Sequence, residues 1–137
     1  MGAFKMILTG HIINKGKAEG YAIVVNTPFS FIGDFDPTTG KLLMSEKMGE
    51  YMRGKVLVCP TGKGGTLGPY VAYDAMIRGT APVAIVCDIA DPILALSAIT
   101  IDIPMIDNFN KKLLKECCTD DYIKVNGDEG TVEIIKK

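Results

Sequence analysis

The order of apolar and polar positions predicts mainly strands in the first third of the chain, alternating strands and helices in the middle, and a hairpin at the end. Short apolar runs typical of buried strands lie at 21–25, 55–59 and 83–87. A further strand is predicted at 103–106, where Pro104 favours a strand start or a sheet edge. Residues 122–135 alternate around the turn residues of 126–130, which is a hairpin signal.

Three helices are predicted from amphipathic or apolar segments that follow these strands: 70–78, 93–99 and 108–117. Gly79 is a good residue to end the first of them. Asp91 and Pro92 favour the start of the second, with the aspartate as N-cap and the proline in the first helical position. The third helix would turn Phe109, Leu113 and Leu114 inward.

Turn residues divide the first third of the chain. The segment 16–20 is predicted to be a turn, and 34–40, with its Asp-Pro and Thr-Gly steps, a tight reversal. A short extended piece is expected at 29–32, and 41–44 is expected to pair back across the reversal. Residues 46–54 are polar and are predicted to be irregular.

These elements predict an α/β fold: a compact β/β/α domain with a barrel-like mixed sheet and about three helices. Residues 1–137 are expected to form one domain, because no linker, repeat or low-complexity segment interrupts them. A chain of this length buries a hydrophobic core without help from disulfides or metals.

Composition narrows the function classes. The formal net charge is −1, with 15 basic and 16 acidic residues, so neither nucleic acid nor a membrane is an expected partner. No apolar run is long enough for a transmembrane helix. Cys59 and Cys87 fall in predicted strands, whereas Cys117 and Cys118 are adjacent. No C-x-x-C spacing exists, so we expect no metal or cluster on this chain and a reduced, cytoplasmic environment.

The segment best suited to bind a ligand is Cys59-Pro-Thr-Gly-Lys-Gly-Gly-Thr-Leu-Gly-Pro69, which lies between a predicted strand and a predicted helix. Such a loop brings backbone N–H groups and the positive end of a helix dipole close to an anion. Lys63 would add a point charge, and Thr61 and Thr66 would add hydroxyl donors. The spacing fits neither a Walker A motif nor a dinucleotide fingerprint. The alternative interpretation is a tight turn whose glycines serve geometry alone.

Other polar residues do not complete a catalytic set. His11 is the only histidine, and nothing beside it in the sequence marks it as a base. Asp34 and Asp36 are better explained as turn caps than as an acid–base pair. The chain therefore has an anion-ready loop without a convincing base, which fits a subunit that completes an active site on another chain.

Seven segments match the pattern of a known family, and the match is in register from about Gly10 to the C-terminus. The segments are GKAEG at 16–20, FSFIGDFDPTTG at 29–40, GKVLV at 54–58, PTGKGGTLG at 60–68, APVAI at 81–85, DPILALSA at 91–98 and IPMI at 103–106. They resemble the small subunit of aconitase X. Similar chains act in the dehydration of phosphomevalonate, and related enzymes dehydrate cis-3-hydroxyproline.

The resemblance implies the swivelling β/β/α domain of the aconitase superfamily. It implies a heterodimer with a large catalytic subunit that carries a 4Fe-4S cluster, and no cofactor on this chain. The reaction would be the dehydration of a small anionic hydroxy acid, most simply a phosphomevalonate-like substrate of the mevalonate route to isoprenoids. The implied substrate-binding residues are Thr61, Gly62, Lys63, Gly64 and Gly65.

One position departs from the family pattern. The resemblance places a serine base in the glycine-rich loop, but this chain has Gly65 there, which has no side chain to accept a proton. Thr66 follows it and is the candidate catalytic hydroxyl. Lys63 still matches the family's basic position.

Two other functions remain open at this stage. The tail at 121–134 is similar to the end of phosphocarrier-like swivelling domains, and that function would require His11 to be phosphorylated. A non-catalytic, ligand-binding homologue is the second alternative, and it is consistent with glycine at position 65.

Overall fold

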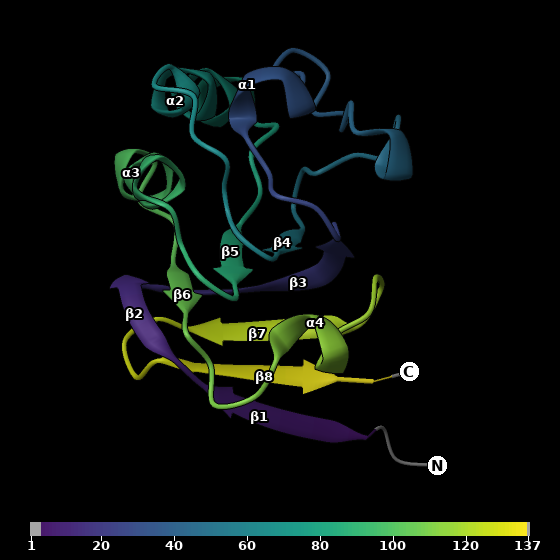
Figure 1. Ribbon diagram of the computed structural model, residues 1–137, viewed down its shortest axis with the longest axis vertical. Coiled ribbons are helices and arrows are strands. Elements are labelled where there is room, and N and C mark those ends of the chain that lie inside the picture. The colour runs from purple at the N-terminus through teal and green to yellow at the C-terminus, as the bar shows by residue number, and fades with distance from the viewer. Residues whose placement is uncertain (1–3, 137) are drawn as a thin grey trace.

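The structure is a computed structural model that describes residues 4–136, and its elements form three layers (Figure 1). The elements in chain order are β1 (Lys5–Thr9), β2 (His11–Asn14), β3 (Lys17–Val24), α1 (Phe31–Asp34), the 3-10 turn η1 (Ser45–Lys47), β4 (Val56–Cys59), α2 (Gly68–Arg78), β5 (Ala84–Cys87), α3 (Pro92–Thr100), β6 (Met105–Asp107), α4 (Leu113–Glu116), β7 (Tyr122–Asn126) and β8 (Thr131–Ile135).

The strands form one mixed sheet in the order β1-β8-β7-β3-β4-β5-β6-β2. Strands β3, β4, β5 and β6 run parallel, whereas β1, β8, β7 and β3 pair antiparallel, as do β6 and β2. In Figure 1, α2 and α3 lie above the parallel strands and the antiparallel strands β7, β8 and β1 lie below them. This β/β/α layering confirms the fold class predicted from the sequence.

Strand β3 joins the two halves of the sheet, and this corrects one prediction. Residues 17–21 pair with β7 and residues 22–24 pair with β4. The predicted turn at 16–20 is therefore wrong, because distant strand pairing outweighs the local glycine signal. Gly20 has a different reason to be glycine: a Cβ there would lie 2.6 Å from the carbonyl oxygen of Gly54.

The first two predicted helices are present. Helix α2 ends at Gly79, whose φ of 75° is the left-handed conformation that glycine adopts readily. Helix α3 starts as predicted: the Asp91 carboxylate accepts hydrogen bonds from the N–H groups of Ile93 and Leu94. Strand signals and capping residues thus place the central β–α–β–α units correctly.

One local prediction is wrong and another holds only in part. The helix expected over 108–117 is only the single turn α4, because Asn108 takes a φ of 52° and donates its N–H to the carbonyl of Asp88. The extended piece expected at 29–32 is present at its start, where Phe29 bridges to Gly62 and Ser30 is extended, and the one-turn helix α1 replaces it from Phe31 on. Ser30 caps this turn, and Gly33 bends it with a φ of 90°. Both corrections come from hydrogen bonds that the polarity pattern does not register.

The core divides along the two faces of the parallel strands. Side chains alternate, so that one set packs under the helices and the other packs against β1, β7 and β8. The helix-side set from these strands is Ile23, Leu57, Cys59, Ile85, Cys87 and Met105. Burial on both faces explains why these strands are continuously apolar in sequence. Among the described residues, no helix is long and apolar enough to span a membrane.

Candidate functional site

The glycine-rich loop lies where the sequence places it, between β4 and α2. The strand ends at Cys59, and the loop is held beside residue 29 by two backbone hydrogen bonds. The N–H of Phe29 donates to Thr61 O at 2.9 Å, and the N–H of Lys63 donates to Phe29 O at 3.2 Å. The loop is therefore anchored to the sheet through its first half, at the carboxyl end of a central parallel strand.

Three loop glycines are required by geometry. A Cβ on Gly62 would collide with the carboxylate of Asp91, which caps the neighbouring helix α3. Gly64 and Gly65 have φ values of 84° and 90°, which side-chain-bearing residues rarely adopt. The loop's path thus depends on glycine in both its buried and its exposed parts.

Backbone N–H groups in the second half of the loop are free to bind a ligand. Within residues 4–136, no acceptor is found for the N–H groups of Gly64, Gly65, Thr66 and Leu67. Leu67 is the N-cap of α2 and has no polar side chain to satisfy them. Four successive donors ahead of a helix N-terminus form a suitable cradle for an oxyanion.

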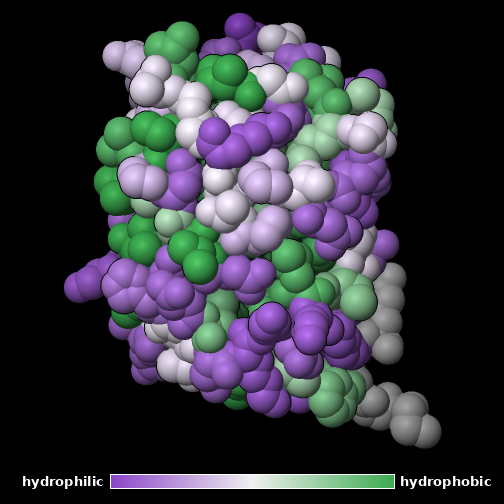
Figure 2. All heavy atoms as spheres, viewed as in Figure 1, coloured by the Kyte–Doolittle hydropathy of each residue, from purple (hydrophilic) through white to green (hydrophobic). Residues whose placement is uncertain are grey.

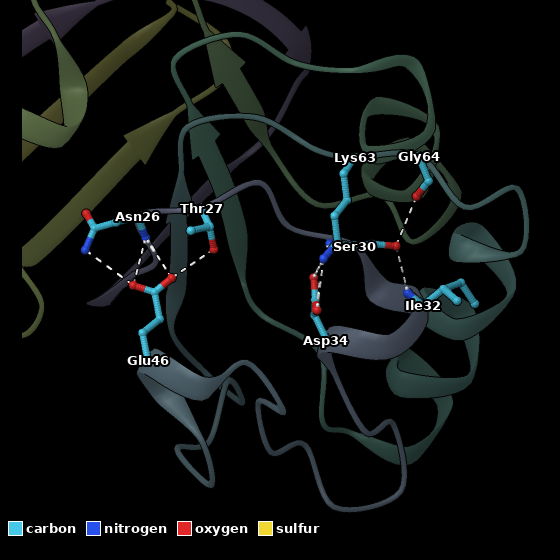
Figure 3. Close-up of polar contacts among 8 residues, drawn as sticks. All are labelled: Asn26, Thr27, Ser30, Ile32, Asp34, Glu46, Lys63 and Gly64. Carbon is cyan, nitrogen blue, oxygen red and sulfur yellow. Dashed lines mark hydrogen bonds and ion pairs between the residues drawn. The ribbon is translucent and has the colours of Figure 1, made fainter.

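Lys63 does not stand alone beside this cradle. Its ammonium Nζ lies 3.0 Å from Oδ2 of Asp34, at the end of α1 (Figure 3). Ser30, at the start of the same turn, donates its hydroxyl to Gly64 O at 3.0 Å. Sequence reasoning assigned Asp34 to turn capping and did not consider Ser30. Asp36 does cap its turn, accepting from the N–H of Thr38 at 2.9 Å.

The hydroxyl candidates lie in different surroundings. A Cβ on Gly65 would lie 3.1 Å from the hydroxyl oxygen of Ser30, so a buried hydroxyl already adjoins the place of the missing side chain. Thr61 is half-buried near the start of the loop. Thr66 is exposed, and it lines a mainly apolar groove between α2 and α3 together with Pro69, Tyr70, Tyr73, Leu96 and Thr100.

The remaining titratable candidates lie outside the loop. The imidazole of His11, on β2, contacts the buried carboxylate of Asp107 at 3.1 Å. Cys59 and Cys87 are fully buried, as predicted, and face each other across β4 and β5. A hydrogen bond with Cys59, together with burial, raises the pKa of the Cys87 thiol. No group of three His, Cys, Asp or Glu side chains in the described part of the chain could hold a metal ion.

Comparison with known proteins identifies the family. A family model described as the aconitase X swivel domain matches residues 7–134. The chain belongs to the aconitase X swivel-domain family. The resemblance inferred from the sequence motifs is therefore confirmed, and the glycine-rich loop lies inside the matched region.

Relatives of this swivel domain match over nearly their whole length. The phosphomevalonate dehydratase small subunit of Methanosarcina acetivorans is 42% identical over 132 residues, which are 94% of this chain and 91% of that protein. The protein of the same name from Thermococcus kodakarensis is 43% identical, with 96% and 98% covered. The crystal structure of Thermococcus kodakaraensis aconitase X in its holo-form superposes with a TM-score of 0.88 at 41% identity, covering 96% of this chain and 99% of that one.

Proposed function

We propose that this chain is the small subunit of a phosphomevalonate dehydratase, and that its glycine-rich loop binds an anionic group of the substrate. The observation that carries the proposal is the row of free N–H groups at 64–67 beside Lys63, in a family whose relatives have this name. Phosphomevalonate has a carboxylate and a phosphate, and both are oxyanions that such a cradle recognises.

The loop residues have separate roles in this proposal. Dehydration breaks a C–H bond beside the carboxylate and a C–OH bond on the next carbon, and it releases water. Lys63 and the N–H groups of Gly64 and Gly65 hold the oxyanion, while Thr61 and Gly62 set the loop's path. Thr66 has the exposed hydroxyl next to Gly65, and we assign it the handling of the proton.

The rest of the active site is assigned to a larger partner subunit in a cytoplasmic heterodimer. The name "small subunit" of the relatives implies such a partner. A 4Fe-4S cluster bound to the partner would supply Lewis acidity for the departing hydroxyl. The described residues of this chain do not fit a cluster of their own, since no group of three or more His, Cys, Asp or Glu side chains lies together and Cys59 and Cys87 form only a pair in the core.

An apolar face next to the loop supports the assignment of a partner. Large hydrophobic side chains on and around α2 and α3 are exposed: Leu67, Tyr70, Tyr73, Ile77, Leu96 and Ile99. In Figure 2 hydrophobic residues gather over these two helices, on the left of the view. This face begins at Thr66, so a subunit that covers it also encloses the glycine-rich loop.

The proposal is tested by purifying the chain alone and together with the larger subunit from its own cell. We expect the pair to dehydrate phosphomevalonate and the single chain to show neither activity nor bound iron. In the pair, Thr66→Val should lower kcat by about 100-fold, as expected when a proton-transfer group is lost. Thr38→Val is the matched control, because it removes an exposed threonine hydroxyl outside the loop, and it should retain most of kcat. A pair without dehydratase activity, or full activity in T66V, would contradict the corresponding assignment.

The phosphocarrier alternative has less support. It requires phosphoryl transfer to His11, but that imidazole is paired with Asp107 on β2 and lies outside the glycine-rich loop. Incubation of the chain with phosphoenolpyruvate and a phosphoryl-transfer enzyme, followed by mass spectrometry, tests this alternative. Phosphate on His11 would favour it over the dehydratase.

A further inference from the structure

The ammonium of Lys63, proposed above to bind a ligand anion, is already paired with the carboxylate of Asp34. Lys63 Nζ lies 3.0 Å from Asp34 Oδ2 and 3.3 Å from Oδ1, so both oxygens are engaged by one ammonium (Figure 3). The Lys63 side chain is 50% exposed, whereas that of Asp34 is only 14% exposed. The lysine is therefore the mobile partner of the pair, and the aspartate is the fixed one.

Backbone contacts fix the aspartate in place. Asp34 Oδ2 accepts a hydrogen bond of 3.0 Å from the N–H of Ser30, the residue that caps α1. The Ser30 hydroxyl accepts from the N–H of Ile32 and donates to Gly64 O, both at 3.0 Å. The one-turn helix is thus fastened to the loop at Gly64 and to Lys63 through Asp34. This arrangement differs from a chance surface ion pair, in which both side chains are free to move.

The ion pair between Lys63 and Asp34 reduces the positive charge available to an anion at the loop. The free N–H groups at 64–67 are one residue from Lys63, and an oxyanion bound there would gain from its positive charge. Asp34 cancels that charge and would repel the oxyanion. An anion that arrives at the loop must therefore draw the Lys63 ammonium away from a carboxylate that cannot follow.

We propose that Asp34 is a built-in counterion of Lys63 that sets how tightly the loop binds an oxyanion. It acts through Lys63 and is a positioning residue. This inference rests on the proposed function, because that function makes Lys63 a substrate-binding residue. Asp34 keeps Lys63 ordered before the substrate arrives and lowers the affinity of the loop, so that only an anion also held by the N–H groups displaces it.

The experiment is a titration of the full chain with inorganic phosphate, and separately with acetate, at constant ionic strength. Binding is followed through the NMR amide signals of residues 64–67. Asp34→Asn removes the charge and keeps the size of the side chain. We expect it to lower the dissociation constant for phosphate by about two- to five-fold, the range of partly exposed ion pairs. Asp36→Asn is the matched control: it removes a carboxylate from the same segment that does not contact Lys63, and it should change nothing.

A double-mutant cycle identifies the route of the effect. Lys63→Gln should weaken phosphate binding, and in that background Asp34→Asn should bring no gain. An equal gain with and without Lys63 would overturn the inference, because the carboxylate would then act as a general charge. If Lys63→Gln weakens binding but Asp34→Asn has no effect, the inference fails and the proposed function stands. If phosphate and acetate leave the amide signals of 64–67 unmoved in every variant, the loop does not bind anions, and that part of the proposed function is wrong.

The assembled enzyme gives a readout that a merely structural role would not produce. There, Asp34→Asn should lower KM for the substrate by a similar factor and leave kcat within about two-fold, because substrate binding changes and the proton-transfer group does not. A fall in kcat at unchanged KM would overturn the inference. If D34N is unstable, Asp34→Ser carries the same expectation, since it also removes the charge and provides a hydroxyl oxygen as a hydrogen-bond acceptor in place of the carboxylate oxygen.

Discussion

Two neighbouring strand-to-helix turns begin alike and end differently. Strands β4 and β5 are buried, parallel and in register, and their last residues, Cys59 and Cys87, face each other. The turn after β5 closes quickly, and Asp91 caps its helix with two hydrogen bonds. The turn after β4 is longer, and its N-cap, Leu67, offers no side-chain acceptor. A proline stands in the first turn of both helices, so proline does not explain the difference.

The comparison separates two uses of a helix N-terminus. At α3 the N–H groups are satisfied within the chain, so this turn contributes to stability. At α2 the N–H groups just ahead of the helix are left free, and two of the four belong to glycines, so this turn contributes to binding. The stable turn supports the binding turn directly, because the carboxylate of Asp91 packs against Gly62.

The largest expected effect on stability comes from Gly62, where the two turns are in contact. Gly62→Ala places a Cβ against the Asp91 carboxylate, which must move and weaken the cap of α3. We expect a loss of about 2–4 kcal/mol in the free energy of unfolding, from overpacking and partial loss of the cap. Urea denaturation measures it. Because Gly62, unlike Gly64 and Gly65, has no positive φ, backbone strain does not add to this loss. Gly49→Ala, at a φ of 83° in open space, measures such strain separately. An unchanged free energy of unfolding in Gly62→Ala would show that the turns are not in contact.

A smaller effect on the free energy of unfolding tests the contact between Cys59 and Cys87, the strand ends from which the two turns start. Because the pKa of the Cys87 thiol is raised above its ordinary value of 9.0, the folded state keeps a proton that the unfolded chain releases near that pH. Stability from this group is present below pH 9 and is lost as the pH rises above it. Between pH 8 and pH 10 the free energy of unfolding should fall by about 1.4 kcal/mol through this thiol.

The measurement is urea unfolding of the wild type and of Cys87→Ala at both pH values. The variant should lose this part of the decline, whereas Cys118→Ala, which alters an exposed cysteine, should keep it. An identical decline in C87A and the wild type would mean that the Cys59–Cys87 contact does not hold the thiol protonated.

The smallest effect separates stability from binding. Asp91→Ala removes the cap of α3 and should cost about 1 kcal/mol, whereas Asp91→Asn, an equally good cap, should cost little. Because the free N–H groups of the other turn are not bonded to Asp91, the response of residues 64–67 to phosphate should persist in both variants. Loss of that response in D91A alone would show that the binding turn depends on the cap of its neighbour.

The sequence predicts this central pair of turns well because their signals are local. Asp91, Pro92 and Gly79 specify helix ends within a few residues of themselves, and the apolar runs of β4 and β5 specify buried strands. The start of β3 was not predictable in this way. Its first residues become a strand only because β7, from the far end of the chain, pairs with them.

The candidate site likewise has a part that the sequence predicts from local signals and a part that depends on distant contacts. The glycines and Lys63 are consecutive, so the loop is visible in the sequence. Asp34 is not visible as its partner, because the Asp-Phe-Asp-Pro order is a sufficient local signal for a turn. The pairing depends on Phe29 lying beside Gly62, a contact between distant segments that periodicity does not report. Its only trace in the sequence is that both segments belong to the motifs of one family.

The pairing of β1 with β8 has a consequence for how the protein is made. Lys5 lies opposite Ile135 and Thr9 opposite Thr131, so the first strand of this fold in chain order pairs only with its last. Until β8 has been synthesised, β1 has no partner strand, and closing so long a loop carries an entropic cost that slows folding. The sheet is therefore completed only once β8 is available, and a truncation that removes β8 would deprive β1 of its partner along its whole length.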